Sequence, residues 1–468
     1  MKYNSFFANL SLWLALCAGL MLSSCEKSPK LTVSPQNVTF DAFPEELIDI
    51  EISTAVNWTV TVIQNEEWLL VSPKSGKGNG TITLEAAEHH EFSERVARIA
   101  ISGEGVKTDT VRVYQAPDAD IQQYIKDETF REFCLENYDT DPSDGKISMK
   151  EARKVTFIDV SEMQISSLAG IDYFPKLTRL DCSYNKIESI DLSKNKELLN
   201  LNCSYNSIKS LDVSSNTEIK TIKCSDNPIT HIDVSGLTKL TDLWIDNADL
   251  SSIDVSSNEK LEWLFISNNK LENIDVSHNP ELMQLMCGEN DLAELNVSNN
   301  TKLVTLYCGN NKFNSLNLDN NTALEDLYCT SNLLTVINLS KNVSLTGLNC
   351  AHNKLSSLNL SNCQYLTRLY CESNQLTELI LSSNKALVYL HCDANLLTTL
   401  NLNNNTELSG FRCTYSKLQN SIDLSKNTKL AYIELQNNPN LKTISVWSSF
   451  VEKKEYIKDE DAKWVKIP

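Results

Sequence analysis

The chain contains 468 residues, of which 61 are Asp or Glu and 42 are Lys or Arg, so its formal net charge at pH 7 is -19. A field of this sign repels nucleic acids and anionic lipid headgroups, and no block of basic residues interrupts it. These numbers argue against a nucleic-acid-binding protein and against attachment to a membrane by surface charge.

The N-terminal residues have the composition of an export signal. Lys2 precedes an apolar run over residues 10–22, which is too short to span a bilayer and is typical of a secretory signal. The small residues before Cys25 resemble a bacterial lipobox, which implies cleavage before Cys25 and acylation of that cysteine. We therefore expect a lipoprotein signal peptide over residues 1–24 and a lipid-attached tether over residues 25–30. The alternative is an ordinary signal peptide with an incidental cysteine.

Acylation would decide where the protein resides. Several acyl chains together hold a protein firmly on a membrane, whereas a single chain does not. The predicted location is therefore outside the cytoplasm, on the outer membrane and facing the cell exterior, with the lipid as the only contact with the membrane.

Residues 31–117 alternate apolar and polar side chains in seven short runs that are separated by turn residues such as Gly78 and Gly80. Seven short strands with regular breaks predict a small antiparallel β-sandwich. The fold class expected for the whole chain is therefore an all-β sandwich followed by the repeat array described below.

This sandwich region resembles the BACON family, whose members are immunoglobulin-like modules near the N-termini of exported Bacteroidetes proteins. The resemblance rests on Trp58, Trp68, the segment SPKSGKGNGTITL, Arg98 and the closing VYQA. It implies an immunoglobulin-like sandwich, and the family name records a proposed carbohydrate-binding role. The alternative is a spacer that lifts the rest of the chain from the membrane, because both tryptophans look like core residues.

Residues 118–154 combine helical apolar spacing with an acidic turn, and we expect them to cap the open end of the repeat array that follows. The turn resembles an EF-hand calcium loop with one inserted residue. The candidate calcium ligands are Asp139, Asp141, Asp144 and Glu151. An alternative needs no metal, because Ser148 and Glu151 have the spacing of a capping box that opens a short helix. No other cofactor is expected.

A 21-residue pattern that begins at Leu177 with LTRLDCSYNKI recurs through most of the remaining chain. Its form, LxxLxLxxNxL, resembles the leucine-rich repeat, with Cys182 in the third leucine position. About 14 such repeats cover residues 155–446. The resemblance implies a right-handed, β-rich solenoid whose coils are stable only when stacked. Residues 447–468 are rich in aromatic side chains and are expected to cap the last coil.

Each repeat is numbered here from its first leucine. Positions 1, 4, 6, 11, 14 and 16 are apolar, and asparagine recurs at positions 9 and 19. A buried asparagine at a tight corner can satisfy backbone groups of its own and neighbouring coils, so both asparagine rows are predicted to be structural. Position 6 is cysteine in ten coils, with Ile245 and Ile266 as replacements. We therefore expect free, packed thiols, with disulfides or a metal site as alternatives.

Position 5 lies between two inward side chains of the strand, so it faces away from the core on the concave sheet. Down the coils this position changes from polar to aromatic and back, and position 3 adds two aromatic residues. Exposed aromatic patches usually mark binding sites, although aromatic residues also favour strands in general. The candidate ligand-binding residues are Trp244, Trp263, Phe265, Met286, Tyr307, Tyr328, Tyr370, Tyr389 and His391.

These features predict a non-catalytic, adhesin-like surface protein that presents an aromatic face to a protein partner. A glycan that stacks on the same rings is the alternative. A more remote alternative is a glycoside hydrolase, because Glu372 and Asp393 occupy position 7 of successive coils, about 5 Å apart on strand spacing, with His391 beside them. Outward acids on an open sheet are normally solvated, so we predict no catalytic residues and no enzyme.

Overall fold

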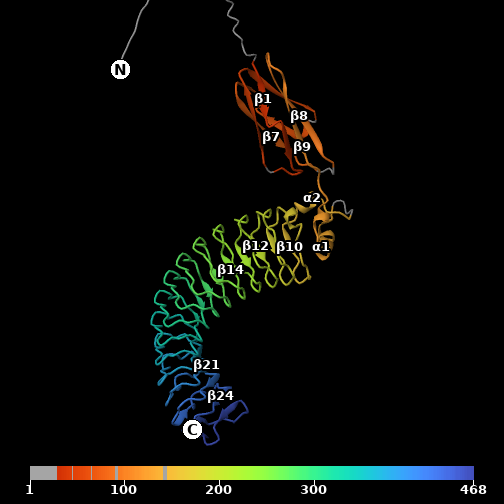
Figure 1. Ribbon diagram of the computed structural model, residues 1–468. Helices are drawn as coiled ribbons and strands as arrows, with labels where there is room; N and C mark the ends of the chain where they lie inside the picture. The colour runs from red at the N-terminus through yellow and green to blue at the C-terminus, as the bar shows by residue number, and fades with distance from the viewer. Residues whose placement is uncertain (1–28, 45, 65, 90–92, 141–144) are drawn as a thin grey trace, which may run out of the picture. The chain divides into compact units, whose positions relative to one another are not determined.

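The computed structural model describes residues 29–468 except 45, 65, 90–92 and 141–144, and it divides into two compact units between Ala119 and Asp120 (Figure 1). The expected signal peptide and the lipidation site at Cys25 lie outside the described residues. Within the described part of the chain, no helix is long and apolar enough to cross a bilayer.

The first unit contains two β-sheets that share one apolar core, with alternate residues buried in strands such as β3 (Ile48–Thr54). Strands β2 and β9 run parallel, so the sandwich is not wholly antiparallel as the sequence pattern suggested. Its immunoglobulin-like topology stays a prediction. One sheet contains, in spatial order, β1 (Leu31–Ser34), β3 (Ile48–Thr54), β7 (Gly80–Ala86) and β5 (Leu69–Ser72). The other contains β2 (Asn37–Phe40), β9 (Asp109–Gln115), β8 (Arg95–Gly103), β4 (Asn57–Gln64) and β6 (Ser75–Lys77), and a 3-10 turn, η1 (Glu66–Trp68), precedes β5.

Both tryptophans of this unit belong to its core. Trp58 and Trp68 keep only 3% and 7% of their surface exposed. The Trp58 indole donates a hydrogen bond to the Gly78 carbonyl oxygen at 2.8 Å, and a Cβ added at Gly76 would stand 2.1 Å from the ring. Only glycine leaves room for the indole there. Neither ring has a free face for sugar stacking, which favours the spacer interpretation over carbohydrate binding by these residues.

The second unit begins with a 3-10 helix, η2 (Ile121–Tyr124), followed by α1 (Glu128–Tyr138) and the short α2 (Met149–Ala152). Phe130 of α1 is fully buried in the same apolar core as the coils that follow. Tyr138 packs edge-on against the Phe174 ring of the first coil, with ring centroids 5.9 Å apart. The helical spacing in the sequence therefore marks side chains that close the end of the solenoid.

The capping box predicted at the start of α2 is confirmed. The Glu151 amide donates to Ser148 Oγ at 3.2 Å, and the Ser148 amide donates to the Glu151 carboxylate at 2.9 Å. The second carboxylate oxygen accepts a hydrogen bond from the Thr140 amide at 2.7 Å. Both oxygens of this candidate calcium ligand are thus engaged by backbone donors.

The other candidate calcium ligands divide into two groups. Asp139 is the C-cap residue of α1, and its Oδ2 accepts a hydrogen bond from the Gly145 amide at 2.8 Å. Asp141 and Asp144 lie outside the described residues. Calcium binding by this loop stays a prediction.

The rest of the unit is a solenoid in which 15 strands form one parallel sheet (Figure 1). The coils follow one another along an arch, with the sheet on its inner side. A 3-10 turn, η3 (Ile171–Tyr173), lies in the first coil. The strands, in order, are β10 (Phe157–Asp159), β11 (Arg179–Asp181), β12 (Asn200–Asn202), β13 (Thr221–Lys223), β14 (Asp242–Trp244), β15 (Trp263–Phe265), β16 (Gln284–Met286), β17 (Thr305–Tyr307), β18 (Asp326–Tyr328), β19 (Gly347–Asn349), β20 (Arg368–Tyr370), β21 (Tyr389–His391), β22 (Gly410–Arg412), β24 (Tyr432–Leu435) and β26 (Tyr456–Lys458).

Asparagine at position 9 binds its coil to the preceding coil, except where Ala248 or Ser416 replaces it. The Asn332 amide nitrogen donates to the carbonyl oxygens of Cys308, Cys329 and Thr330 at 3.1 to 3.2 Å. Its Oδ1 accepts from the Phe313 amide of the preceding coil at 3.1 Å. This side chain is therefore fully satisfied although it is buried.

The asparagine side chain at position 19 has fewer of its polar atoms in hydrogen bonds than the one at position 9. The Asn300 amide nitrogen donates to the carbonyl oxygens of Val276 and Asn279 at 2.9 and 2.8 Å. Its Oδ1 is buried and has no hydrogen-bond partner, and the same holds for the other asparagines of this row. Leu237 and Cys363 replace asparagine at this position in two coils. The row therefore tolerates an apolar side chain.

The C-terminal tail extends the solenoid as well as covering its end. Strand β26 pairs with β24 in the main sheet. Strand β27 (Lys463–Ile467) pairs with β25 (Leu441–Trp447) in a second parallel sheet that also contains β23 (Asn420–Asp423). The Tyr456 hydroxyl donates to the Leu430 carbonyl oxygen at 2.7 Å. The aromatic tail thus buries the last coil by adding strands to both sheets.

The two asparagine rows are expected to differ in their contribution to stability. Asn332→Leu should lower the free energy of unfolding by about 2 kcal/mol, because the buried Phe313 amide loses its acceptor. Asn300→Leu should cost less than about 1 kcal/mol, because its oxygen is already unpaired and Leu237 fills the same place in another coil. Urea unfolding of the full chain, followed by circular dichroism, measures both. Equal losses of stability in the two variants would contradict the different contributions expected of positions 9 and 19.

Candidate functional site

The concave face is defined here as the side chains at positions 3, 5 and 7 of the coils, which point away from the core of the second unit. The parallel strands pair in register, so Trp244 aligns with Phe265, and the row continues without a shift to His391. Asn349 is the one polar interruption between Tyr328 and Tyr370. The row therefore contains all the candidate residues at position 5, which are Trp244, Phe265, Met286, Tyr307, Tyr328, Tyr370 and His391.

Neighbouring rings of this row contact one another. The centroids of Tyr307 and Tyr328 are 4.1 Å apart with planes 9° from parallel, and those of Trp244 and Phe265 are 4.8 Å apart at 31°. Burial, followed by the hydrogen bond to Tyr328, raises the pKa of Tyr307. Because coils repeat about every 4.8 Å, a ring covers the face of its neighbour. Tyr307 and Tyr328 thus each have one ring face covered by the other ring.

The two candidate residues at position 3 are more open. Trp263 keeps 37% and Tyr389 44% of its surface exposed. Tyr389 lies against Gly410 of the next strand, where an added Cβ would stand 2.8 Å from the ring. These two side chains are therefore the most accessible aromatic surfaces among the predicted ligand-binding residues.

A cation already lies on the N-terminal end of the row. Lys223 Nζ stands 3.6 Å from the Trp244 ring centroid. Beside it, burial raises the pKa of Asp246, although the Ser267 amide donates to this carboxylate at 2.8 Å. The Trp244 indole nitrogen is buried and has no hydrogen-bond partner. The concave face can therefore hold a positive charge against an aromatic ring.

A second cation spans two coils in the middle of the face. Arg368 Nη2 and Asp326 Oδ1 are 2.9 Å apart and come from strands β20 and β18. Between them lies Gly347, where a Cβ would stand 2.1 Å from the Asp326 carboxylate. The glycine thus leaves room for the ion pair.

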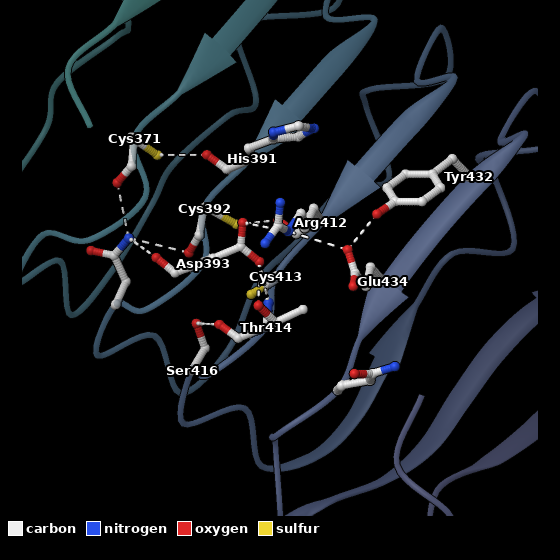
Figure 2. Close-up of polar contacts among 12 residues, drawn as sticks. Cys371, His391, Cys392, Asp393, Arg412, Cys413, Thr414, Ser416, Tyr432 and Glu434 are labelled. Carbon is white, nitrogen blue, oxygen red and sulfur yellow. Dashed lines mark hydrogen bonds and ion pairs between the residues drawn. The ribbon is translucent and has the colours of Figure 1, made fainter. Parts of the chain in front are cut away.

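A charged network ends the row, as Figure 2 shows. Arg412 Nε lies 3.1 Å from the Asp393 carboxylate and 3.2 Å from that of Glu434. The buried Asp393 also accepts hydrogen bonds from the Thr414 amide at 2.6 Å and from its hydroxyl at 2.7 Å. Tyr432 donates its hydroxyl proton to Glu434. Sequence reasoning did not connect these residues. The sequence signal that could have indicated this network is the pair of opposite charges at position 7 of one coil, Asp393, and position 5 of the next, Arg412.

This network argues against the glycosidase alternative. Asp393 keeps only 6% of its surface exposed and contacts Arg412 and Thr414 through an ion pair and two hydrogen bonds, so it offers little surface to a substrate. Glu372, at the same position one coil earlier, is half-buried, and its Oε2 has no hydrogen-bond partner. A retaining pair needs two carboxylates that both face the substrate.

A shallow cavity of about 520 Å³ lies at the corner of the coils near the start of the row. Here Ala248 replaces the position 9 asparagine, and the Ile229 amide donates instead to the Asn227 carbonyl oxygen at 2.8 Å. The lining is polar and includes Asp226 and Lys270, the latter 2.6 Å from Asp249. Every backbone group that the missing amide would bind has another partner.

The position 6 cysteines form a buried row. In the described part of the chain all twelve cysteines are free, which confirms the packed thiols and excludes disulfides among them. In Figure 2, the Cys371 thiol donates to the His391 carbonyl oxygen and the Cys392 thiol to that of Arg412, each at 3.5 Å. Burial raises the pKa of Cys287 to about 12. Such thiols are neutral and unreactive at neutral pH.

These thiols lead to a prediction for pH and alkylation. Above the unfolded thiol pKa of about 8.5, the unfolded chain releases protons that the folded chain retains, so stability should fall as the pH rises from 8 to 10. Iodoacetamide at pH 8 should leave the position 6 row unmodified until urea unfolds the protein. Peptide mass spectrometry measures the labelling. Labelling of folded Cys287 at the rate of free glutathione would contradict the burial.

Comparisons with known proteins agree with the two units. The family described as the viral BACON domain matches residues 30–117. No curated protein matches the chain. The solved functional domain of InlJ from Listeria monocytogenes, described as including a cysteine ladder, is 28% identical with a TM-score of 0.62, over 72% of this chain and 83% of that one.

Two further solved structures share the fold. An internalin, inlF, from Listeria monocytogenes is 21% identical with a TM-score of 0.59, over 72% of this chain and 98% of that one. The plant peptide hormone receptor RGFR1, in complex with RGF2, is 21% identical with a TM-score of 0.50, over 60% of this chain and 56% of that one. None of the three is described as an enzyme. The chain thus joins a region that matches the BACON domain to a leucine-rich repeat solenoid like those of the internalins.

Proposed function

We propose that this protein is a non-catalytic, adhesin-like surface protein whose concave face binds a protein partner. The aromatic row at position 5 is the observation that carries the proposal. Strand propensity does not account for it, because Asn202 and Asn349 occupy the same position and their coils form equivalent strands. Aromatic side chains are enriched where binding energy concentrates in protein interfaces.

The geometry of the rings favours a polypeptide over a sugar. A sugar stacks on the open face of an aromatic ring, whereas Tyr307 and Tyr328 cover each other's faces at 4.1 Å. Ring edges and hydroxyl groups in a continuous row suit the side chains of an extended or folded protein segment. The glycan alternative rests on Trp263 and Tyr389, whose rings are more exposed.

The comparisons with solved structures support the fold, and they do not identify a ligand. A plant receptor with this fold has been solved in complex with RGF2, and each of two Listeria monocytogenes structures aligns with 72% of this chain. Likeness of fold does not specify a ligand. The partner is therefore argued from the concave face itself.

Localisation belongs to the same proposal. The lipobox-like residues before Cys25 support acylation and an outer-membrane location that faces the exterior, with the BACON region as a spacer. Cys25→Ala should abolish the incorporation of radiolabelled palmitate into the full-length protein in cells. Labelling of the variant at the wild-type level would remove the lipid anchor from the proposal.

The binding test compares two stacked tyrosine pairs. The double variant Tyr307→Ala, Tyr328→Ala should weaken binding to a partner at least 30-fold, because loss of aromatic hot spots typically costs about 2 kcal/mol or more. The control is Tyr184→Ala, Tyr205→Ala, a pair that stacks at 4.2 Å and lies at position 8, outside the concave face. An array of purified extracellular proteins and of glycans, probed with the full chain, supplies the partner.

The outcomes of this array separate the candidates. Protein hits that only the concave variant loses support the proposal. Glycan hits that Trp263→Ala, Tyr389→Ala abolishes would replace it with the glycan alternative. Hits that survive both concave variants would show that the binding site lies elsewhere.

A further inference from the structure

One acid on the concave face differs from all the others. At positions 3, 5 and 7 of the coils, which the structure describes completely, every acidic side chain except one has a hydrogen bond or an ion pair within the chain. The paired acids are Asp159, Asp181, Asp242, Asp246, Asp326, Asp393 and Glu434. The exception is Glu372, for which the structure shows no side-chain partner, and its Oε2 is also buried.

The neighbours of Glu372 explain why it is unpaired. At the same position, the preceding coil has Ala351, which carries no polar side chain, and the following coil has Asp393, which repels a second carboxylate. The nearby cations are already engaged, because Arg368 pairs with Asp326 at 2.9 Å and Arg412 with Asp393 at 3.1 Å. A half-buried carboxylate is costly without a donor or a cation.

Aromatic rings stand beside this carboxylate. Tyr370 is two residues earlier on the same coil, and its ring meets that of His391 edge-to-face, with centroids 4.9 Å apart. An edge-to-face pair leaves part of one ring face uncovered, unlike the parallel pair of Tyr307 and Tyr328. Burial raises the pKa of Tyr370, the Arg368 charge opposes this rise and the Glu372 charge adds to it, so both charges lie close to the ring. A ring close to a carboxylate attracts a cation through both groups.

The same face shows how it holds cations of its own chain. Lys223 Nζ stands 3.6 Å from the Trp244 ring centroid, and Arg412 bridges the carboxylates of Asp393 and Glu434. Carboxylate and ring are thus both used as cation acceptors on this sheet. Glu372 and Tyr370 place the two kinds of acceptor two residues apart, and among the described residues neither has an ion pair or a cation–ring contact.

We propose that Glu372, with the ring of Tyr370, receives a lysine or arginine side chain of the protein partner. This inference rests on the proposed function and assigns a chemistry to one end of the row. The net charge of -19 would also draw a basic partner toward the face. The partner would therefore place apolar or aromatic groups along Tyr307 and Tyr328 and a basic residue at Glu372.

A charge-matched pair of variants tests the proposal with a defined probe, the hexa-arginine peptide, titrated into the full chain by calorimetry. Glu372→Gln should weaken binding of this peptide about tenfold, because a close ion pair is lost. The control is Glu378→Gln, an exposed acid of the same coil that lies outside the concave face and changes net charge equally. Its effect should stay within twofold.

Two further measurements keep the result interpretable. Glu372→Gln should leave the urea midpoint unchanged or higher, because the carboxylate makes no bond that the amide would lose. Glu372→Asp should recover part of the affinity, since it keeps the charge and shortens its reach. Equal weakening by Glu372→Gln and Glu378→Gln, or no binding of the peptide by the wild-type chain, would overturn the proposal.

The test also separates this inference from the proposed function. If the Tyr307→Ala, Tyr328→Ala variant loses the protein partner while Glu372→Gln keeps both the partner and the peptide, only the basic-residue assignment is wrong. If neither set of changes affects the partner, the concave face is not the binding site.

Discussion

The buried asparagine at position 9 is the contact on which the rest of the solenoid depends. Its amide nitrogen binds carbonyl oxygens of two successive coils, and its Oδ1 binds a backbone amide of the coil before, as Asn332 does with Phe313. A coil of 21 residues has too few apolar side chains to be stable alone. Hydrogen bonds between coils therefore accompany the apolar stacking, and together they set one register along the sheet.

That register determines what the concave face can do. Equivalent side chains of neighbouring coils lie about one strand spacing apart, which is the distance at which aromatic rings stack and charges interact strongly. Rings at position 5 therefore form a continuous row, and acids at position 7 need partners from nearby coils. Asp393 has Arg412 as such a partner. Glu372 has none among the residues that the structure describes. The face therefore has an aromatic middle and, near one end, an unpaired carboxylate that can accept a cation.

Much of the candidate site could be predicted from the alternation of side chains in a strand. Because Leu180 and Cys182 point inward, Asp181 and its counterparts must point outward, and this rule placed the whole row from Trp244 to His391. The free thiols followed from the exchange of cysteine with Ile245 and Ile266. The ion pair of Arg368 with Asp326 could not be predicted, since it joins residues two coils apart across Gly347.

The C-terminal tail and the β-sandwich also contain features that the sequence pattern could not predict. Aromatic residues after Val446 indicated a cap, but strand pairing alone decides that β26 and β27 extend two sheets. The antiparallel pattern of the sandwich did not reveal that β2 and β9 run parallel. The relative direction of two strands depends on which segments pair. The alternation of apolar and polar residues within one strand does not contain this information.

The sequence by itself therefore determined the repeat, the inward and outward positions and the rows that follow from them, because a fixed period places equal positions side by side. The tertiary structure alone decided which ring faces are covered, which charges are paired and which carboxylate is left without a partner. These depend on side-chain directions and on contacts between coils. No single repeat contains that information, because the ring stacks and the ion pairs of Arg368 and Arg412 join residues of at least two coils.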